Sequence, residues 1–447
     1  MTEATVAQVS GKPNAKAWQW RLIITAGMGF FTDAYDLFII GVVTAILAPI
    51  WHLSVIQVAI LNAAALVAAA FGATIFGVVL DKLGRKKLYG LEVVILFLGA
   101  ILGASSPSFV WLLIARFIVG FGIGGDYPSS ALVASESSSG ERRGLLVLLV
   151  FAMQALGLLV GPLLASFLMA VGVPHNILWR LLIGFGAIPA ASVFYLRRRI
   201  QESAHFVRVK EKETFQVSRV IRDLALEENN RQHDLPLKTK PASLLDKKWL
   251  IYLICTASAW FLLDVAFYGN GISSVMIINA IHPNSNLLEH TLIAAMIFMI
   301  FAVPGYFFAA LKVDKIGRKP LQIIGFLMIG LMYGAIAFVP SVTNDIILFT
   351  LIYGASYFFV NFGPNSTTFL IPSEIFPTAI RAKAHGISAA VGKVGAFVGA
   401  FLLPLILHSY GLHAAMGFTS IVALLGVVST LPLPEMKQKD LSVTDEI

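Results

Sequence analysis

Long runs of apolar residues, interrupted by short polar segments, dominate the pattern of this chain. Each run is about 18 to 25 residues long, which is what a helix needs to cross the hydrocarbon core of a bilayer. The runs lack the period-two alternation that is typical of half-buried strands. The pattern therefore predicts an all-α membrane protein with twelve transmembrane helices. The expected spans are 21–47, 56–80, 87–106, 109–134, 145–172, 178–197, 248–280, 290–311, 320–341, 344–372, 384–408 and 412–432.

Composition supports lipid as the solvent of this chain. Of its 447 residues, 57% are hydrophobic and only 13% are charged, whereas about 25% of the residues of an ordinary soluble domain are charged. The net charge of +8 would suggest nucleic acid in a soluble protein. Here the basic residues fall in short loops between apolar runs, which is the positive-inside pattern of a membrane protein. We therefore expect the lipid bilayer as the environment and no nucleic-acid partner.

Loop charges predict the orientation in the membrane. The second loop, DKLGRKKLYG, has four basic residues and the fourth, SSSGERRG, has two, whereas the first and third loops have none. On the expected outer side only Arg180 departs from this alternation. The first residues also lack the apolar core and cleavage site of a signal peptide. We therefore expect a multi-pass protein of the cell membrane, plasma or inner, with both termini in the cytoplasm.

Two stretches of the first half recur in the second half. The sequence DKLGRK at 81–86 returns as DKIGRK at 314–319, and the Glu136 to Arg143 spacing returns as Glu374 to Arg381. The repeat predicts two six-helix bundles, at 1–199 and 248–447, joined by a polar cytoplasmic linker at 200–247. In such an arrangement the solute site is expected at the interface of the halves, near the middle of the bilayer.

The repeated charges predict a lock between helices on the cytoplasmic side. Acidic and basic side chains in neighbouring helix ends can pair in one conformation and separate in another. The alternative is that they only set the orientation of the loops. The candidate lock residues are Asp81, Arg85, Glu136, Arg143, Asp314, Arg318, Glu374 and Arg381.

The first of these motifs carries a family resemblance. The pattern G-x-x-x-D-x-x-G-R-K-K at 77–87, between the second and third spans, resembles the signature of the major facilitator superfamily. The resemblance covers nearly the whole chain and implies two pseudo-symmetric six-helix bundles. It says little about which solute is carried.

Charged residues inside the spans point to function, because a charge in the bilayer core is costly and is retained by default for a purpose. Asp33 and Asp36 are three residues apart and share a helix face. Burial and a neighbouring acid both favour the neutral form of a carboxyl group, so such an acid can take up and release a proton. Alternatively, these acids pack or cap near a wet end of the helix.

Further ionisable residues lie in the third, fourth and eleventh spans. Asp126 follows a glycine-rich stretch in the fourth span. Arg116 of the same span and Glu92, which opens the third, are expected to pair with each other, in a pair that is either static or broken when a nearby acid is protonated. Lys393 lies well within the eleventh span and needs a buried partner, unless it extends to an interface.

Four segments together narrow the resemblance. They are GFFTDAYDLF at 29–38, GGDYP at 124–128, FAMQ at 151–154 and NFGPNSTTF at 361–369. These segments resemble the phosphate:proton symporter family within the superfamily. The resemblance implies import of inorganic phosphate together with protons by alternating access. It also implies a phosphate site formed by Tyr127, Gln154, Trp260, Asp264, Tyr268 and Asn365.

The chemistry of this set suits phosphate. Tyrosine hydroxyls, the tryptophan N–H and side-chain amides can donate to phosphate oxygens, and a carboxylate or amide oxygen can accept from its O–H groups. Trp260, Asp264 and Tyr268 are each four residues apart and form one helical stripe. Without its acid, such a stripe would more often be core packing. Asp264 either pairs with Lys393 or is protonated and donates a hydrogen bond.

The proton-coupling residues are predicted to be Asp33, Asp36 and Asp126, assisted by Glu92, Arg116 and Lys393. No metal-ligand set, cofactor motif or nucleotide-binding Walker sequence is present in the sequence. We therefore expect no enzyme activity, no cofactor, no ATP-driven transport and no obligatory protein partner. The alternatives are a transporter of another small solute, such as a sugar or an organic or aromatic acid, and a receptor that binds without transport.

Overall fold

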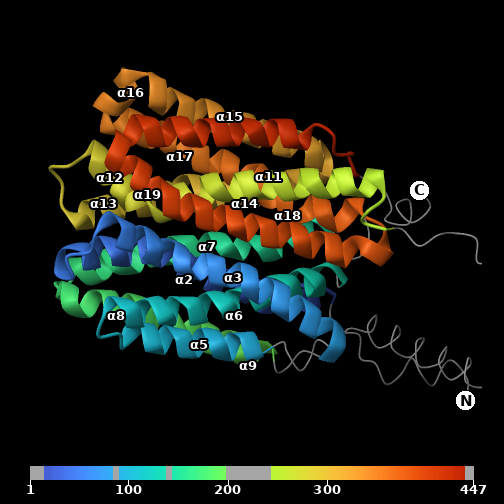
Figure 1. The fold of residues 1–447 in the computed structure, drawn as a ribbon, viewed down its shortest axis with the longest axis horizontal. Helices are drawn as coiled ribbons and strands as arrows, with labels where there is room; N and C mark the ends of the chain where they lie inside the picture. Colours follow the sequence, from blue (N-terminus) through green and yellow to red (C-terminus); the bar gives the residue numbers. More distant parts are fainter. Residues whose placement is uncertain (1–14, 84–89, 137–142, 198–242, 438–447) are drawn as a thin grey trace, which may run out of the picture.

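The computed structural model of the chain describes residues 15–83, 90–136, 143–197 and 243–437. It describes the side chains of these residues except at 15–22, 77–83, 126–136, 143, 196–197 and 378–379. Most of the predicted linker at 200–247 therefore lies outside the described residues. The described parts are built from helices and connecting turns, as Figure 1 shows.

The described part of the first half contains seven helices. Their bounds are α2 Ala15–Ile50, α3 Val55–Leu83, α5 Leu91–Ala104, α6 Phe109–Glu136, α7 Arg143–Ala170, α8 His175–Phe185 and α9 Ala187–Arg197. The described part of the second half consists of more numerous and more often interrupted elements. Their bounds are α11 Lys247–Ile272, α12 Ser274–Ile281, α13 Leu287–Ile297, the π-helix η1 Phe298–Ala302, α14 Val303–Ile316, α15 Arg318–Phe338, α16 Pro340–Asn344, α17 Ile346–Phe362, α18 Pro364–Ile375 and α19 Thr378–Thr430.

These helices account for the twelve predicted spans. In the described part of the chain, nine helical stretches are long and apolar enough to cross a membrane, and two shorter apolar helices lie at Leu91–Ala104 and Phe109–Gly125. One of the nine, within α19, contains two spans. The chain turns back at Gly411, whose φ of 80° and ψ of 178° interrupt the helix and favour glycine. The expected spans 384–408 and 412–432 are the two arms of α19.

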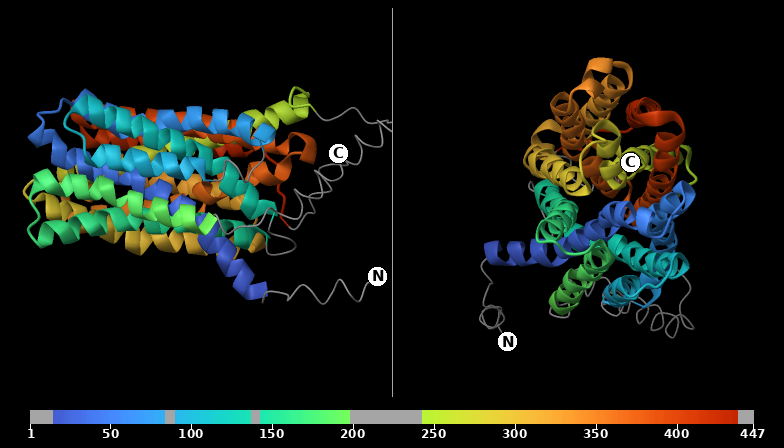
Figure 2. Two further views of the ribbon diagram at one scale, coloured as in Figure 1. Left: turned by 90° about the horizontal axis from the view of Figure 1, so that it is seen from below. Right: turned by 90° about the vertical axis from the view of Figure 1, so that its left-hand side faces the viewer.

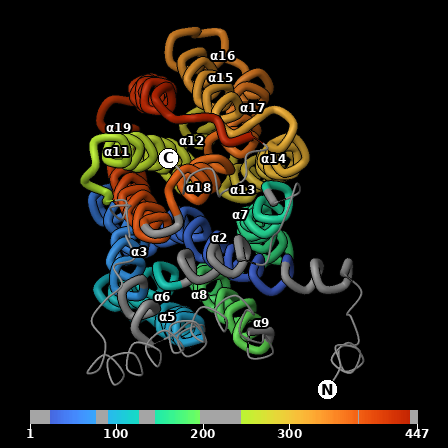
Figure 3. Tube along the Cα trace, turned by 90° about the vertical axis from the view of Figure 1, so that its right-hand side faces the viewer, coloured from blue at the N-terminus to red at the C-terminus, as the bar shows by residue number. Residues whose placement is uncertain are grey.

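The helices form two neighbouring groups, which are clearest when the bundle is viewed along its length (Figure 2, right). One group runs from α2 to α9 and the other from α11 to α19. The groups meet where α7 packs on α13 and α14, α3 packs on α19, and α2 packs on α11 and α12. Figure 3 shows the same arrangement from the opposite end, with α2, α7, α18 and α19 near the centre. The start of α2 and the end of α19 lie at the same end of the bundle (Figure 1).

The outer surface of the bundle is apolar. Phe71, Val110 and Phe167, from three different helices, are each 62% exposed. In water such surfaces would aggregate, whereas in a bilayer they contact acyl chains at no cost. An α-helix satisfies most of its backbone polar groups internally, which is the condition for crossing the membrane.

Several second-half helices are interrupted inside the bundle. The α11–α12 junction is at Ser273, the α17–α18 junction is at Gly363, and η1 interrupts the α13–α14 span. Broken transmembrane helices expose backbone and side-chain polar groups at the depth where solutes bind in transporters. The interruptions therefore indicate that a solute site is to be expected at the centre of the bundle.

Candidate functional site

Three buried side chains follow one face of α11. Trp260, Asp264 and Tyr268 are 4%, 2% and 1% exposed. Their spacing of four residues places them on the same side of the helix. The stripe lies inside the protein, and none of its members faces lipid.

Helix α19 brings a cation to this stripe. The Nζ atom of Lys393 donates a hydrogen bond to the Tyr268 hydroxyl over 2.9 Å and lies 3.5 Å from Oδ2 of Asp264. The helices approach closely because a Cβ atom at Gly395 or Gly399 would collide with carbonyl oxygens of α11. Lys393 is only 3% exposed, so it does not extend to an interface. Its geometry matches the paired arrangement with Asp264.

Asn365 lies in the first turn of α18, directly after the helix break. The break is at Gly363, where helix α15 approaches closely. A side chain would not fit there, because an added Cβ atom would lie 2.6 Å from the Cα atom of Gly325. Asn365 is 5% exposed. Its Nδ2 atom donates to the Tyr306 hydroxyl over 2.6 Å and to Oδ1 of Asn361 over 2.8 Å. The broken helix therefore supplies a fixed amide group near the centre of the bundle.

Gln154 of α7 is the described site residue from the first half. It is 2% exposed, and its Oε1 atom accepts no hydrogen bond from the described part of the chain. One turn earlier, Phe151 stacks on Phe369 of α18, with ring centroids 4.8 Å apart. Phe30 packs edge-on against both rings at 5.3 and 5.7 Å. We call Phe30, Phe151 and Phe369 the aromatic layer, and it joins the two halves.

Ring contacts connect the predicted site residues around this layer. Phe151 packs at 5.9 Å from Tyr306, the partner of Asn365, and Phe369 packs at 6.2 Å from Trp260. On the other side of the stripe, Tyr268 stacks on Phe38 of α2 at 5.3 Å. The structure thus gathers at the interface of the halves five of the six predicted solute-binding residues: Gln154, Trp260, Asp264, Tyr268 and Asn365.

The remaining site residue, Tyr127, and the neighbouring Asp126 are within α6. Their side chains lie outside the described residues. Their helix is held close to α3, because a Cβ atom at Gly124 would collide with the carbonyl oxygen of Ala69. The roles predicted for Tyr127 and Asp126 stay predictions.

The first half buries a second set of charges. Asp33 and Asp36 on α2 and Arg116 on α6 are 1%, 3% and 3% exposed. The Nη1 atom of Arg116 donates to the backbone carbonyl of Asp36 over 2.9 Å. Within the described residues, Nε and Nη2 of Arg116 and Oδ2 of Asp36 have no hydrogen-bond partner. This set is therefore less completely bonded than most buried charged groups.

The pair expected between Glu92 and Arg116 is wrong. The residue of α6 that packs against Glu92 is Gly122, at which a Cβ atom would lie 2.9 Å from the Glu92 carbonyl oxygen. A rise of about 9 Å along α6 separates Gly122 from Arg116. Glu92 accepts a hydrogen bond from the backbone N–H of Gly90 over 3.0 Å, at the start of α5. Because α5 and α6 run in opposite directions, the start of α5 meets the middle of α6 near Gly122, beyond Arg116.

The predicted lock residues of the second half form a buried ion cluster. Nε and Nη2 of Arg318 donate to the two carboxylate oxygens of Glu374 over 2.9 and 3.0 Å. Arg318 also pairs with Asp314 at 2.9 Å. The second carboxylate oxygen of Asp314 accepts from the backbone N–H of Leu145 over 3.1 Å, at the start of α7. The cluster therefore contacts the first half as well as its own.

The structure says less about whether the other predicted lock residues pair between helices. Arg381 donates to the backbone carbonyl of Phe376 over 2.8 Å. The side chains of Asp81, Arg85, Glu136 and Arg143 lie outside the described residues. The role of the whole set in gating stays a prediction.

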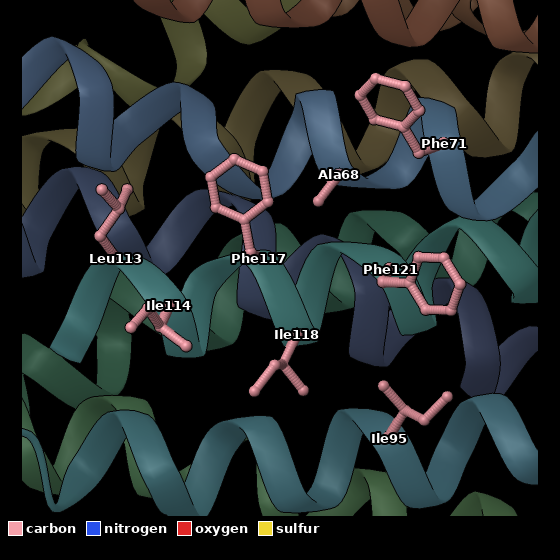
Figure 4. A pocket seen from close by; sticks show the side chains of 8 residues that line it. All are labelled: Ala68, Phe71, Ile95, Leu113, Ile114, Phe117, Ile118 and Phe121. Atoms are coloured by element: carbon pink, nitrogen blue, oxygen red, sulfur yellow. The ribbon is translucent and has the colours of Figure 1, made fainter. Parts of the chain in front are cut away.

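A groove of about 630 Å³ between α3, α5 and α6 is unrelated to this central site. It is lined only by apolar side chains, which Figure 4 shows on the three helices that surround it. Several of them are exposed on the outer surface, including Phe71 at 62% and Ile114 at 54%. The groove offers no donor to an anion and suits an acyl chain of the surrounding lipid.

Metal binding has no support in the described part of the chain, where no group of three or more His, Cys, Asp or Glu side chains is arranged to hold a metal ion.

Sequence reasoning also missed residues that shape the site. Tyr306 and Asn361 hold Asn365, and Glu435 accepts from the backbone N–H groups of Arg318 and Lys319 over 3.1 and 2.9 Å. The spacing of four residues between Asn361 and Asn365 was not a reliable signal, because the helix break at Gly363 lies between them.

Residues 18–447 match the family model described as "Sugar (and other) transporter". The Inorganic phosphate transporter 1-1 of Arabidopsis thaliana is 35% identical over 95% of this chain and 94% of its own length. The Low affinity inorganic phosphate transporter 1 of Petunia hybrida is 35% identical over 95% and 92% of the two chains.

Among solved structures, the proton:xylose symporter XylE bound to 6-bromo-6-deoxy-D-glucose superposes with a TM-score of 0.78. The alignment covers 97% of this chain and 99% of XylE at 18% identity, so it bears on the fold alone. XylE has the major facilitator fold, and the relatives are transporters rather than enzymes. This chain is therefore a multi-pass membrane transporter with the major facilitator fold, and it belongs to the sugar (and other) transporter family.

Proposed function

We propose that this transporter is a symporter that imports inorganic phosphate together with protons by alternating access. The observation that carries the proposal is the buried cluster of Lys393, Tyr268 and Asp264 at the interface of the halves. A cation, a hydroxyl group and an acid at one place provide a charge partner, a donor and an acceptor for a protonated oxyanion. The relatives named as inorganic phosphate transporters support the same solute.

The amides of Gln154 and Asn365 and the indole N–H of Trp260 complete the proposed phosphate site, together with Tyr127 of α6. A sugar needs no cation at its site, so the buried Lys393 favours an anion. The alternative of an organic or aromatic acid shares the need for a cation. Phosphate is preferred because the site combines a cation and donors for its oxygens with acceptors for its O–H groups.

The proposed proton carriers are Asp33, Asp36 and Asp126, with Glu92, Arg116 and Lys393 adjusting their charge. Moving one net charge through 100 mV supplies about 2.3 kcal/mol. A phosphate monoanion that moves with a single proton is neutral and gains nothing from the membrane potential. Voltage-driven accumulation therefore needs at least two protons for each monoanion, and the three acids are sufficient for that number.

We further propose that the halves 1–199 and 248–447 rock about the site, with the ion cluster around Arg318 opening and closing one end. We propose that this end, and both termini, lie in the cytoplasm of a cell that carries the protein in its plasma or inner membrane, and the loops rich in lysine and arginine support this orientation. Alternating access by rocking of repeats is the common mechanism of this architecture.

The test is transport by the purified chain in sealed proteoliposomes. With an inward proton gradient we expect accumulation of radiolabelled phosphate, together with phosphate-stimulated proton entry reported by a trapped pH dye. Asp126→Asn is expected to abolish proton-driven accumulation while remaining monodisperse in size-exclusion chromatography. Protein-free liposomes are the control. Accumulation of an organic acid but not of phosphate would overturn the proposed solute, and undiminished uptake by Asp126→Asn would remove this acid from coupling.

A further inference from the structure

The orientation of the Asn365 amide is fixed by a chain of hydrogen bonds. Nδ2 of Asn361 donates to the backbone carbonyl of Tyr357 over 2.8 Å. A carbonyl oxygen can only accept, so the nitrogen of the Asn361 amide must face it and its Oδ1 must face Asn365. Because that Oδ1 also only accepts, Asn365 must present its own Nδ2 in return. The bonds themselves thus assign both amides.

This arrangement uses both N–H groups of Asn365. One donates to Asn361 and the other to the Tyr306 hydroxyl over 2.6 Å. The Oδ1 atom of Asn365 accepts no hydrogen bond from the described residues, and it is not among the polar atoms sealed from solvent. Asn365 therefore offers an incoming solute an acceptor and no donor.

We infer that Asn361 and Tyr306 are positioning residues that make Asn365 a selector for protonated oxyanions. The inference rests on the proposed phosphate function. Dihydrogen phosphate and dihydrogen arsenate carry O–H groups that can donate to Oδ1 of Asn365, whereas sulfate at neutral pH carries none. A sulfate oxygen would face the amide oxygen with no proton between them. A site built to pair with a solute O–H group rejects analogues that lack it strongly, because a buried polar group is left unpaired.

Competition in the proteoliposome assay tests the inference. For the unmodified chain we expect unlabelled arsenate to inhibit phosphate uptake at concentrations similar to those of phosphate, and sulfate to have no effect at about 100-fold excess. In Asn361→Leu, which is similar in shape but cannot accept, the Asn365 amide can rotate and donate to any oxyanion. Sulfate is then expected to inhibit at within about 10-fold of the arsenate concentration.

Asn361→Asp is the matched control. A carboxyl group at this position accepts from Asn365 whether or not it is ionised, so exclusion of sulfate is expected to persist. The ratio of inhibition constants does not depend on how much protein is active. If Asn361→Leu does not fold, Tyr306→Phe removes the other partner of the amide and is expected to admit sulfate more weakly. Tyr353→Phe, which deletes a buried hydroxyl bonded to the Asn270 carbonyl over 3.1 Å, serves as its control.

The outcomes separate this inference from the function beneath it. Failure of the unmodified chain to take up phosphate would refute the proposed function. If sulfate inhibits phosphate uptake as strongly as arsenate does, the proposed function stands, but the selector role of Asn365 is overturned. If Asn361→Leu excludes sulfate as well as the unmodified chain does, Asn361 and Tyr306 have no positioning role. Where Asn361→Leu does not fold, the same result for Tyr306→Phe leads to the same conclusion.

Discussion

The two halves bury their charges in different ways. In the second half, Lys393 contacts both Tyr268 and Asp264 through Nζ, so the cation is held by side chains. In the first half, Arg116 donates to the backbone carbonyl of Asp36, and several of the guanidinium and carboxylate atoms lack a partner among the described residues. One cluster is a side-chain ion pair, and the other is a pair of charges that pack together without a direct salt bridge between their described side chains.

This difference suggests a division of labour. Lys393 is held by an ion pair and a hydrogen bond, although Oδ2 of Asp264 accepts no hydrogen bond within the described residues. A cation fixed by two side chains suits the recognition of a solute, because it keeps its position between transport cycles. Buried charged atoms without partners are costly, so a change of protonation there alters the balance between conformations more easily. We therefore assign solute binding mainly to the second half and proton coupling mainly to the first half. Lys393→Met and Asp36→Asn test this assignment, and a third variant tests the contact between the halves.

The largest effect is expected from Lys393→Met, which leaves the Asp264 carboxylate buried without its cation. Breaking a buried ion pair from one side costs about 3–5 kcal/mol of stability. Phosphate uptake is expected to fall about 100-fold or more, because the charge partner of the anion is lost as well. Thermal unfolding in detergent and uptake in proteoliposomes measure the two consequences.

The double variant Asp264→Asn with Lys393→Met is the control for this interpretation. It removes both charges, so it is expected to recover most of the lost stability without recovering transport. If Lys393→Met alone were as stable as the unmodified chain and still transported phosphate, the ion pair would have no part in the site.

A more selective effect is expected from Asp36→Asn in the first half. The substitution preserves shape and removes a titratable group, so proton-driven accumulation is expected to fall about 10-fold or more. Exchange of internal for external phosphate needs no net proton movement and is expected to persist. Measuring accumulation and exchange in the same vesicles separates coupling from binding.

Asp345→Asn is a suitable comparison for that variant. Asp345 caps the start of α17 by accepting from the N–H groups of Ile347 and Leu348, and asparagine caps helices about as well. Both activities should therefore be unchanged. Equal loss of exchange and accumulation in Asp36→Asn would place Asp36 in solute binding instead and would contradict the division of labour.

The sequence predicted the spans well because hydrophobic length is a local property. It placed the two arms of α19 correctly, and the turn between them needs only Gly411. A lysine inside a span indicated the need for a buried partner, and the family resemblance suggested Asp264 for it. The Glu92–Arg116 pair was wrong because its geometry depends on the direction and register of two packed helices. Nothing in the local pattern indicates that Gly122, and not Arg116, meets the start of α5.

The hydrogen bonds that orient Asn365 were also beyond the sequence. Asn361 and Asn365 lie on opposite sides of the break at Gly363, where helical spacing no longer predicts contact. Tyr306 comes from a different helix, and its approach depends on how α14 packs against α17 and α18. Residue types could be assigned to the site from the sequence, whereas donor and acceptor directions required the fold.

The smallest effect is expected from Asp314→Asn, at a contact where the two halves meet away from both charge clusters. Its carboxylate accepts from the start of α7 and pairs with Arg318, which keeps Glu374 as its bidentate partner. The Asp314 side chain is 24% exposed, and a partly exposed ion pair contributes at most about 1 kcal/mol. Such a change shifts a two-state equilibrium by no more than about 5-fold.

That shift can be measured as a distance across the end of the bundle. Cys255 is the single cysteine of the chain, so replacing it with serine leaves a background for spin labels at the exposed positions Ser192 and Lys312. We expect Asp314→Asn to increase the population with separated labels and to change the uptake rate by about 2- to 3-fold. Glu374→Gln, which removes a bidentate partner from the buried Arg318, should act more strongly. An unchanged distance distribution in both variants would show that the cluster stabilises the second half only and has no part in holding this end closed.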